Sequence, residues 1–127
     1  METRLKKITA FTDLLAWQEA HKLVISVYKV TSSFPPKETF SLTDQMRRAA
    51  TSITSNIAEG FGRQTYKEKT QFYYVSHGSL TELENQLLIS RDVGYLKTKD
   101  YDILVAQADI AHKLLMGLIK KTKSFVI

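Results

Sequence analysis

The chain has 127 residues, the length of one domain, and its lack of cysteine excludes disulfide scaffolds, thiol catalysis and thiolate metal sites. Five glycines and two prolines are too few for the tight turns of an all-β protein. Eighteen basic and thirteen acidic side chains give a formal charge of +5, which favours polyanionic partners such as RNA, DNA or anionic lipid. Because no apolar segment is long enough for a signal peptide or a membrane span, we expect a cytoplasmic protein with no membrane partner.

Apolar residues recur at a helical period along most of the chain. This pattern predicts four helices, at approximately 13–33, 41–59, 65–93 and 98–122. The first ends before Phe34-Pro35-Pro36, because the residue before a proline avoids the α region. Helices of about twenty residues joined by short loops pack as an antiparallel bundle. We therefore expect an all-α protein, with residues 1–127 forming a single up-down-up-down four-helix-bundle domain.

Apolar side chains at helical spacing predict which face of each helix enters the core. In the second helix these are Leu42, Met46, Ala49, Ile53 and Ile57. In the fourth helix the predicted inner stripe is Ile103, Ala106, Ile110, Leu114, Gly117 and Leu118.

Turn residues predict where the helices end. Gly60 and Gly62 are expected to close the second helix, and Gly94 the third. Thr65 with Glu68 has the spacing of a capping box, in which the threonine hydroxyl accepts a bond from a backbone N–H, and it predicts the start of the third helix.

A line of polar side chains shares one face of the second helix. It consists of Gln45, Arg48, Ser52, Asn56 and Glu59. The third helix offers possible partners for it in Ser79, Glu82 and Glu84. A buried pair between Arg48 and a glutamate would fix the register of the two helices, whereas a solvated face would carry ion pairs worth about 0–1 kcal/mol each. We expect a structural role for Arg48, Asn56 and Glu59, at helix ends or at a subunit boundary.

Two basic groups are candidate phosphate contacts. One is assigned to the turn between the second and third helices and contains Arg47, Arg63, Lys67 and Lys69. The other lies near the termini and contains Arg4, Lys6, Lys7, Lys120, Lys121 and Lys123. An up-and-down bundle brings both termini and this turn to one end, so the two groups could form a single basic end face. Phe61, Tyr66 and Phe125 could stack there on unpaired bases, although aromatic residues at helix starts are more often part of the core.

The chain lacks the usual arrangements of catalytic residues. It has no glycine-rich phosphate loop, and His77 and Ser79 are two apart on a helix, so they face different ways. A di-iron bundle needs two Glu-x-x-His pairs, whereas this chain offers only Asp109-x-x-His112. We therefore expect a protein that is not an enzyme, with no metal, no cofactor and no small-molecule substrate.

Residues 42–60 read Leu-Thr-Asp-Gln-Met-Arg-Arg-Ala-Ala-Thr-Ser-Ile-Thr-Ser-Asn-Ile-Ala-Glu-Gly. This segment resembles the signature of the ribosomal-RNA intervening-sequence proteins, which have a leucine, then Gln, Arg-Arg-Ala, Ser-Ile and Asn-Ile-Ala-Glu-Gly at this spacing. Trp17, Phe34-Pro35 and Gly78-Ser79-Leu80 also match, so the resemblance covers roughly residues 11–120. Thr54 departs from it, because the family often has proline at that position.

The resemblance implies a left-handed bundle that assembles into a homopentameric ring. Members of the family can be encoded inside intervening sequences of large-subunit ribosomal RNA genes and are usually suspected of binding RNA, without an agreed biochemical role. The fold is also similar to the accessory protein of diversity-generating retroelements, a basic pentamer that binds a reverse transcriptase and nucleic acid. We expect RNA binding through a basic face; the alternative is an interaction scaffold that docks a partner enzyme without binding nucleic acid itself.

Overall fold

A computed structural model describes residues 7–127, which form four α-helices and two short 3-10 helices, with no strand among them. The α-helices are α1 (Leu15–Thr31), α2 (Leu42–Phe61), α3 (Tyr66–Asp92) and α4 (Thr98–Lys123). The 3-10 helices are Phe11–Asp13 and Pro36–Glu38. The all-α prediction and its four helices are confirmed, while the predicted sites Arg4 and Lys6 lie outside the described residues.

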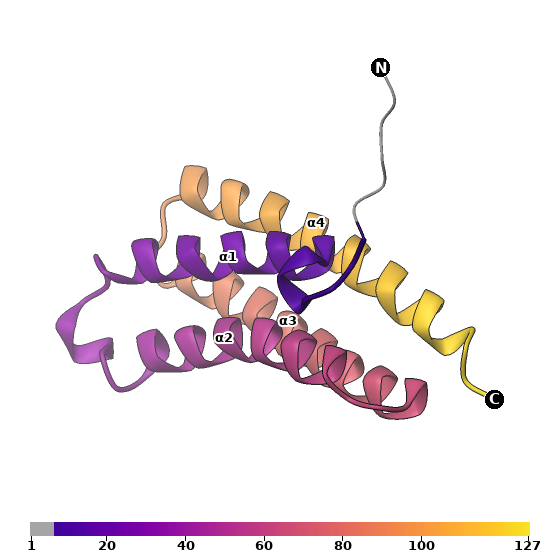
Figure 1. Ribbon diagram of the computed structural model, residues 1–127. Helices are drawn as coiled ribbons and strands as arrows, with labels where there is room; N and C mark the ends of the chain where they lie inside the picture. Colours follow the sequence, from indigo (N-terminus) through magenta and orange to yellow (C-terminus); the bar gives the residue numbers. More distant parts are fainter. Residues whose placement is uncertain (1–6) are drawn as a thin grey trace, which may run out of the picture.

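The four helices are arranged so that each packs against two neighbours. Helix α1 contacts α2 and α4, and α3 also contacts α2 and α4. Successive helices run in opposite directions (Figure 1), so the start of α1, the α2–α3 turn and the end of α4 lie at one end of the bundle. The α1–α2 and α3–α4 connections lie at the other end.

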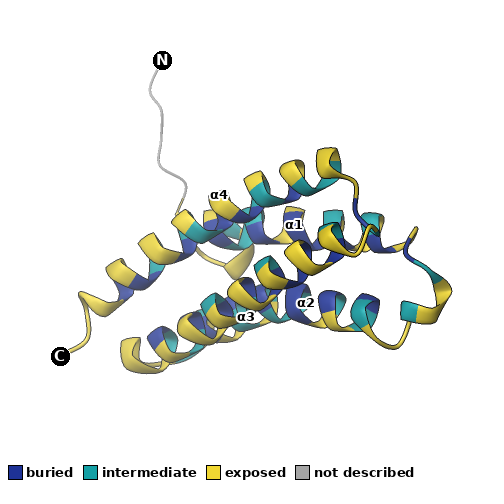
Figure 2. Ribbon diagram, turned by 180° about the vertical axis from the view of Figure 1, so that it is seen from behind, coloured by how far each residue is buried: buried dark blue, intermediate teal, exposed yellow. Residues whose placement is uncertain are grey.

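The core lies along the axis of the bundle, where the inner faces of all four helices meet (Figure 2). Its largest fully buried aliphatic side chains are Leu23, Val27, Met46, Ile53, Ile57, Leu80, Leu83, Leu87, Leu104, Leu115 and Ile119. Burying such a side chain stabilises the fold by about 1.5–3 kcal/mol relative to leaving it exposed. The predicted inner face of α2 is correct, since Met46, Ala49, Ile53 and Ile57 are all buried.

The predicted inner stripe of α4 is correct only at Leu114 and Leu118, which are partly buried and pack against the core. Ile103 and Ile110 are 50% and 48% exposed, and Ala106 is also exposed. The side chains that enter the core are instead Leu104, Ala108, Ala111, Leu115 and Ile119. Both sets repeat at helical spacing, and they differ by a rotation of about 100°, which is one residue of an α-helix.

Two predicted helix ends are confirmed. The Thr65 hydroxyl accepts a hydrogen bond from the Glu68 backbone N–H at 3.1 Å, which caps the start of α3. Gly94 has φ +87° just after α3, and the N–H groups of the next two residues both bond to the carbonyl oxygen of Ser90. A left-handed residue of this kind is the usual stop signal of a helix.

Gly60 does not end α2 but lies within it, at a point where α2 and α3 are packed closely together. A Cβ built on Gly60 would stand 2.8 Å from Cε1 of Tyr73 and 2.9 Å from Cβ of Phe72. The helix runs one residue further, to Phe61, and Gly62 follows with φ −79°, a conformation open to any residue. Gly60 is therefore required for the spacing of the two helices.

Candidate nucleic-acid interface

Residues distant in sequence meet at the end of the bundle that holds the α2–α3 turn. The rings of Tyr66, at the start of α3, and Phe125, after α4, lie 5.0 Å apart. A pocket of about 300 Å³ beside them is lined by Ile8, Leu14, Phe61, Tyr66, Lys69, Tyr73, Leu118, Lys121, Thr122 and Phe125. We call this end, with Lys7, Arg63, Lys67, Lys69, Lys120, Lys121 and Lys123, the basic end.

Several cations of the basic end point into solvent without an acidic partner. Lys67, Lys120 and Lys121 are exposed, and within residues 7–127 none of them forms an ion pair. Lys7 is also exposed. An ammonium group without a carboxylate partner keeps its N–H donors available for an anion from solution.

Two other cations of this end hold the α2–α3 turn together. Arg63 bonds to Glu59 at 3.2 Å, and its guanidinium carbon lies 4.5 Å from the ring centroid of Phe72. The Lys69 ammonium donates to the carbonyl oxygen of Phe61, one of the last carbonyls of α2, and lies 5.3 Å from the centre of that residue's ring. These contacts stabilise the turn, so Arg63 and Lys69, which the sequence suggested for phosphate, have a structural role there.

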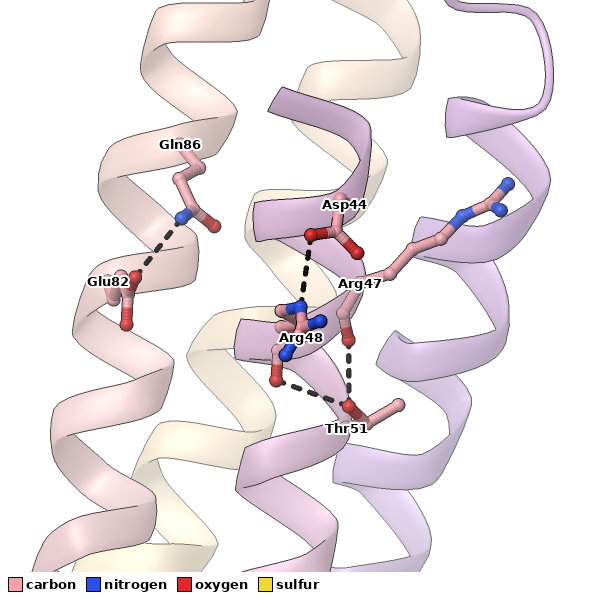
Figure 3. Close-up of polar contacts among 6 residues, drawn as sticks. All are labelled: Asp44, Arg47, Arg48, Thr51, Glu82 and Gln86. Atoms are coloured by element: carbon pink, nitrogen blue, oxygen red, sulfur yellow. Dashed lines mark hydrogen bonds and ion pairs between the residues drawn. The ribbon is translucent and has the colours of Figure 1, made fainter. Parts of the chain in front are cut away.

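Arg47 belongs to the opposite end of the bundle, so its assignment to the α2–α3 turn is wrong. It lies near the start of α2, whereas the turn follows the end of that helix. Its Nε donates to Thr31 Oγ1 at 2.9 Å, and its guanidinium carbon is 4.7 Å from the ring centroid of Tyr28. Figure 3 shows this side chain reaching from α2 towards α1. Arg47 therefore joins two helices at a point remote from the basic end.

Of the two alternatives for Arg48, a buried pair with a glutamate of α3 or a solvated side chain, the described residues show the solvated one. The Arg48 side chain is 80% exposed, and its Nε bonds to Oδ2 of Asp44, one turn earlier on the same helix, at 3.0 Å. Glu82 instead accepts a hydrogen bond from Nε2 of Gln86 at 3.3 Å (Figure 3). An exposed pair four residues apart on one helix contributes about 0.3–0.5 kcal/mol, so Arg48 adds little to the stability of this chain.

The centre of the polar line is a contact between helices. The hydroxyls of Ser52 and Ser79 lie 2.7 Å apart across α2 and α3. Asn56 donates from Nδ2 to both the carbonyl and the hydroxyl of Ser52, at 2.8 and 3.0 Å. The ends of the line, Gln45 and Glu59, are exposed. The predicted face therefore divides into a packed centre and solvated ends.

The structure adds one aromatic residue that the sequence analysis did not single out. Tyr74 is 45% exposed beside the end of α4, where its hydroxyl accepts a hydrogen bond from the Lys123 ammonium at 3.0 Å. The neighbouring Tyr73 is buried and belongs to the core. Two tyrosines in succession on a helix face different ways, but their order along the sequence does not tell which one enters the core.

The described residues contain no set of three His, Cys, Asp or Glu side chains placed to hold a metal ion. His112 does not pair with Asp109. Its Nδ1 lies 3.9 Å from Glu84 Oε1, and its ring is 4.9 Å from that of His77. No helix between residues 7 and 127 is long and apolar enough to cross a bilayer.

Comparison with known proteins identifies the family. A family model described as 23S rRNA-intervening sequence protein matches residues 12–117. A crystal structure from Bacteroides thetaiotaomicron, described as a protein of unknown function from the S23 ribosomal protein family, aligns with a TM-score of 0.77. It is 19% identical and covers 84% of this chain and 96% of its own, which shows a shared fold. No curated protein matches the chain. Because the family model covers α1, α2, α3 and most of α4, the chain belongs to the 23S rRNA-intervening sequence protein family.

Proposed function

We propose that this protein is a non-enzymatic, oligomeric binding protein that engages RNA through its basic end. The observation that carries the proposal is the gathering of Lys67, Lys120 and Lys121, from α3 and α4, at one end without acidic partners among the described residues. Phosphates are the common feature of any RNA strand, and lysine contacts to them supply affinity that does not depend on sequence.

The oligomeric part of the proposal is the pentameric ring that the family resemblance implies. Ile103 and Ile110 support it, because they are half exposed on the outer side of α4 and would be covered by a second copy. A pentamer would carry five times the charge of one chain, a formal +25 from five charges of +5. Such a field would raise the local concentration of RNA near the ring.

The alternative is a scaffold that docks a partner enzyme and has no affinity of its own for nucleic acid. The same exposed residues on α4 favour it, because an apolar stripe can receive a different protein as well as a second copy. The two functions differ in one property, which is whether the purified protein binds RNA at physiological salt.

The decisive experiment measures binding of labelled structured RNA and duplex DNA across a salt series. In the double variant Lys67→Glu/Lys121→Glu we expect at least a tenfold loss of RNA affinity, and a slope of log K against log salt that is smaller by about 2. Arg63 and Lys69 are left unchanged because they hold the α2–α3 turn.

The matched control is Lys29→Glu/Lys37→Glu, which makes the same change of charge at two exposed lysines of the opposite end. We expect its RNA affinity to stay within about threefold of the wild type, and the mass of both variants in solution to be unchanged. If the unmodified protein binds both nucleic acids no better than the nonspecific level of about 10⁻⁴–10⁻⁶ M at physiological salt, the scaffold function replaces RNA binding.

A further inference from the structure

A groove between α3 and α4, at the basic end, combines an aromatic ring with two ammonium groups. It has a volume of about 380 Å³ and is lined by Tyr74, Met116, Ile119, Lys120 and Lys123. Ile119 is buried, while Tyr74 and Met116 are both exposed to solvent. This volume falls within the range of roughly 300–1,000 Å³ that is typical of small-ligand sites.

One cation of the groove is held in place. The Lys123 ammonium donates to the Tyr74 hydroxyl at 3.0 Å and lies 5.6 Å from the centre of the tyrosine ring. It has three N–H donors, so a bond to the hydroxyl leaves others for an anion. Lys120 lies on the same helix, one turn earlier, and lines the same groove. An apolar surface with two cations at its rim suits a ligand that is flat and apolar on one side and anionic on the other.

We propose that this groove binds an unpaired nucleotide of RNA, with the base against Tyr74 and Met116 and the adjoining phosphates on Lys120 and Lys123. The inference rests on the RNA-binding function proposed above and specifies its ligand. In a duplex the faces of the bases are covered by their neighbours, so only an unpaired base can lie against the tyrosine. The protein therefore prefers single-stranded RNA to duplex RNA.

A second aromatic surface lies at the same end. Tyr66 and Phe125 are each about half exposed, and their rings are inclined by only 30°. Lys67 is adjacent to Tyr66 in sequence and is exposed. Tyr66 and Tyr74 are eight residues apart on α3, a separation of about 12 Å along the helix. A single strand that places one base on Tyr74 can thus continue towards further aromatic and cationic side chains.

The test compares the binding of labelled single-stranded oligouridine with that of an RNA duplex of the same length, by fluorescence anisotropy at physiological salt. We expect the single strand to bind more tightly than the duplex, although the duplex has the higher charge density. In Tyr74→Leu we expect the affinity for the single strand to fall about tenfold, with the affinity for the duplex unchanged, because stacking on the ring is lost.

Two further variants isolate the ring. Tyr74→Phe keeps the ring and loses the hydroxyl, and it should retain the single-strand affinity within about threefold. Tyr28→Leu is the matched control, because Tyr28 is 41% exposed and also has a cation over its ring, from Arg47, but lies at the opposite end. It should change neither affinity. If Tyr74→Leu melts at a lower temperature by circular dichroism, Met116→Ala, which changes no charge, tests the same groove and should weaken single-strand binding selectively.

The outcomes separate this inference from the function on which it rests. If neither RNA binds, the RNA-binding function itself is wrong. If both RNAs bind and Tyr74→Leu weakens neither, or weakens both equally, RNA binding stands and the nucleotide site is wrong. If an acidic peptide displaces the fluorescent single strand more effectively than unlabelled RNA does, the groove is a protein-docking site and the inference is overturned.

Discussion

At Gly60 the chain leaves no room for even a methyl group. The atoms that a Cβ would meet are the ring of Tyr73, which is 2% exposed, and the Cβ of Phe72, which is fixed to the backbone of α3. Neither can move aside without displacing the helix, because protein cores are packed as densely as organic crystals. The spacing of α2 and α3 at this end therefore depends on Gly60 having no side chain.

Gly60→Ala is expected to lower the free energy of unfolding by about 1–3 kcal/mol, the usual cost of overpacking a core. This loss comes in spite of the higher helix propensity of alanine. The matched control is Gly78→Ala in α3, where a Cβ would have nothing within 4 Å. It should raise the stability by up to about 1 kcal/mol. Denaturant unfolding measures both, and a Gly60→Ala protein as stable as the wild type would contradict the tight contact.

The buried phenol of Tyr73 makes stability sensitive to high pH. Burial raises its pKa from the ordinary 10.0 to about 12. Above pH 10 the unfolded chain loses this proton before the folded one does, so the contribution of Tyr73 to stability, complete below pH 10, is lost as the pH rises to about 12. The folded state loses up to about 1.4 kcal/mol per pH unit in this window.

Tyr73→Phe removes this ionisation. We expect the unfolding free energy of the wild type to fall by about 1 kcal/mol more than that of Tyr73→Phe between pH 9 and pH 11. Urea titrations at the two pH values measure the difference. Tyr28→Phe removes a phenol from an exposed position and serves as the control. Parallel curves for the wild type and Tyr73→Phe would show that the hydroxyl is not shielded from water.

At the scale of the helices, α4 is the element in which sequence reasoning chose the wrong face. Ile103 and Ile110 are larger than Ala108 and Ala111, yet the alanines are buried and the isoleucines half exposed. Periodicity counts apolar residues and ignores their size, whereas a packed interface also needs small residues where two helices approach closely. Only the neighbouring helices determine which of two equally periodic stripes turns inward.

The outer stripe of α4 can be tested as a contact between copies of the chain. Ile110→Glu is expected to weaken self-association at least tenfold, because it places a carboxylate in an apolar contact, and to leave the melting temperature of the single bundle unchanged. Mass measurement by light scattering over a concentration series shows the shift to smaller species. Leu88→Glu, at a similarly exposed position on α3, is the comparison. Dissociation by Leu88→Glu alone would move the contact to another face.

The sequence predicted helix ends that depend on residues close together in the chain. It did not predict contacts at a helix end that come from residues distant in the chain. The Thr65–Glu68 cap and the stop at Gly94 both depend on residues that lie within a few positions of each other. The start of α2 also has a nearby partner, since its first N–H, at Leu42, bonds to a carboxylate oxygen of Glu38 at 3.4 Å, but that carboxylate has a second and distant contact. The Tyr95 hydroxyl donates to the other oxygen of that carboxylate at 2.8 Å. No local rule connects residues 57 positions apart.

At the scale of the whole molecule, the order and direction of the four helices were enough to predict where the candidate site lies. Alternating helix directions bring the start of α3 and the end of α4 together, and the structure has this arrangement. The role of each cation could not be predicted in the same way. It depends on which side chains of other helices lie beside the cation, and the helical pattern of the sequence does not give those positions. Arg63 lies over Phe72 and pairs with Glu59, whereas Lys67, four positions later, is in solvent.

The pocket at the basic end joins the two most distant parts of the described chain, since Ile8 and Phe125 both line it. The α2–α3 hairpin, in contrast, is closed by contacts such as that of Gly60 with Tyr73, which are near in sequence and cost little loop-closure entropy. Folding can therefore begin at the hairpin and finish where the two chain ends meet. The region that forms last in folding is usually the first to unfold locally. A strand of RNA bound across this end would therefore stabilise the folded chain against local unfolding.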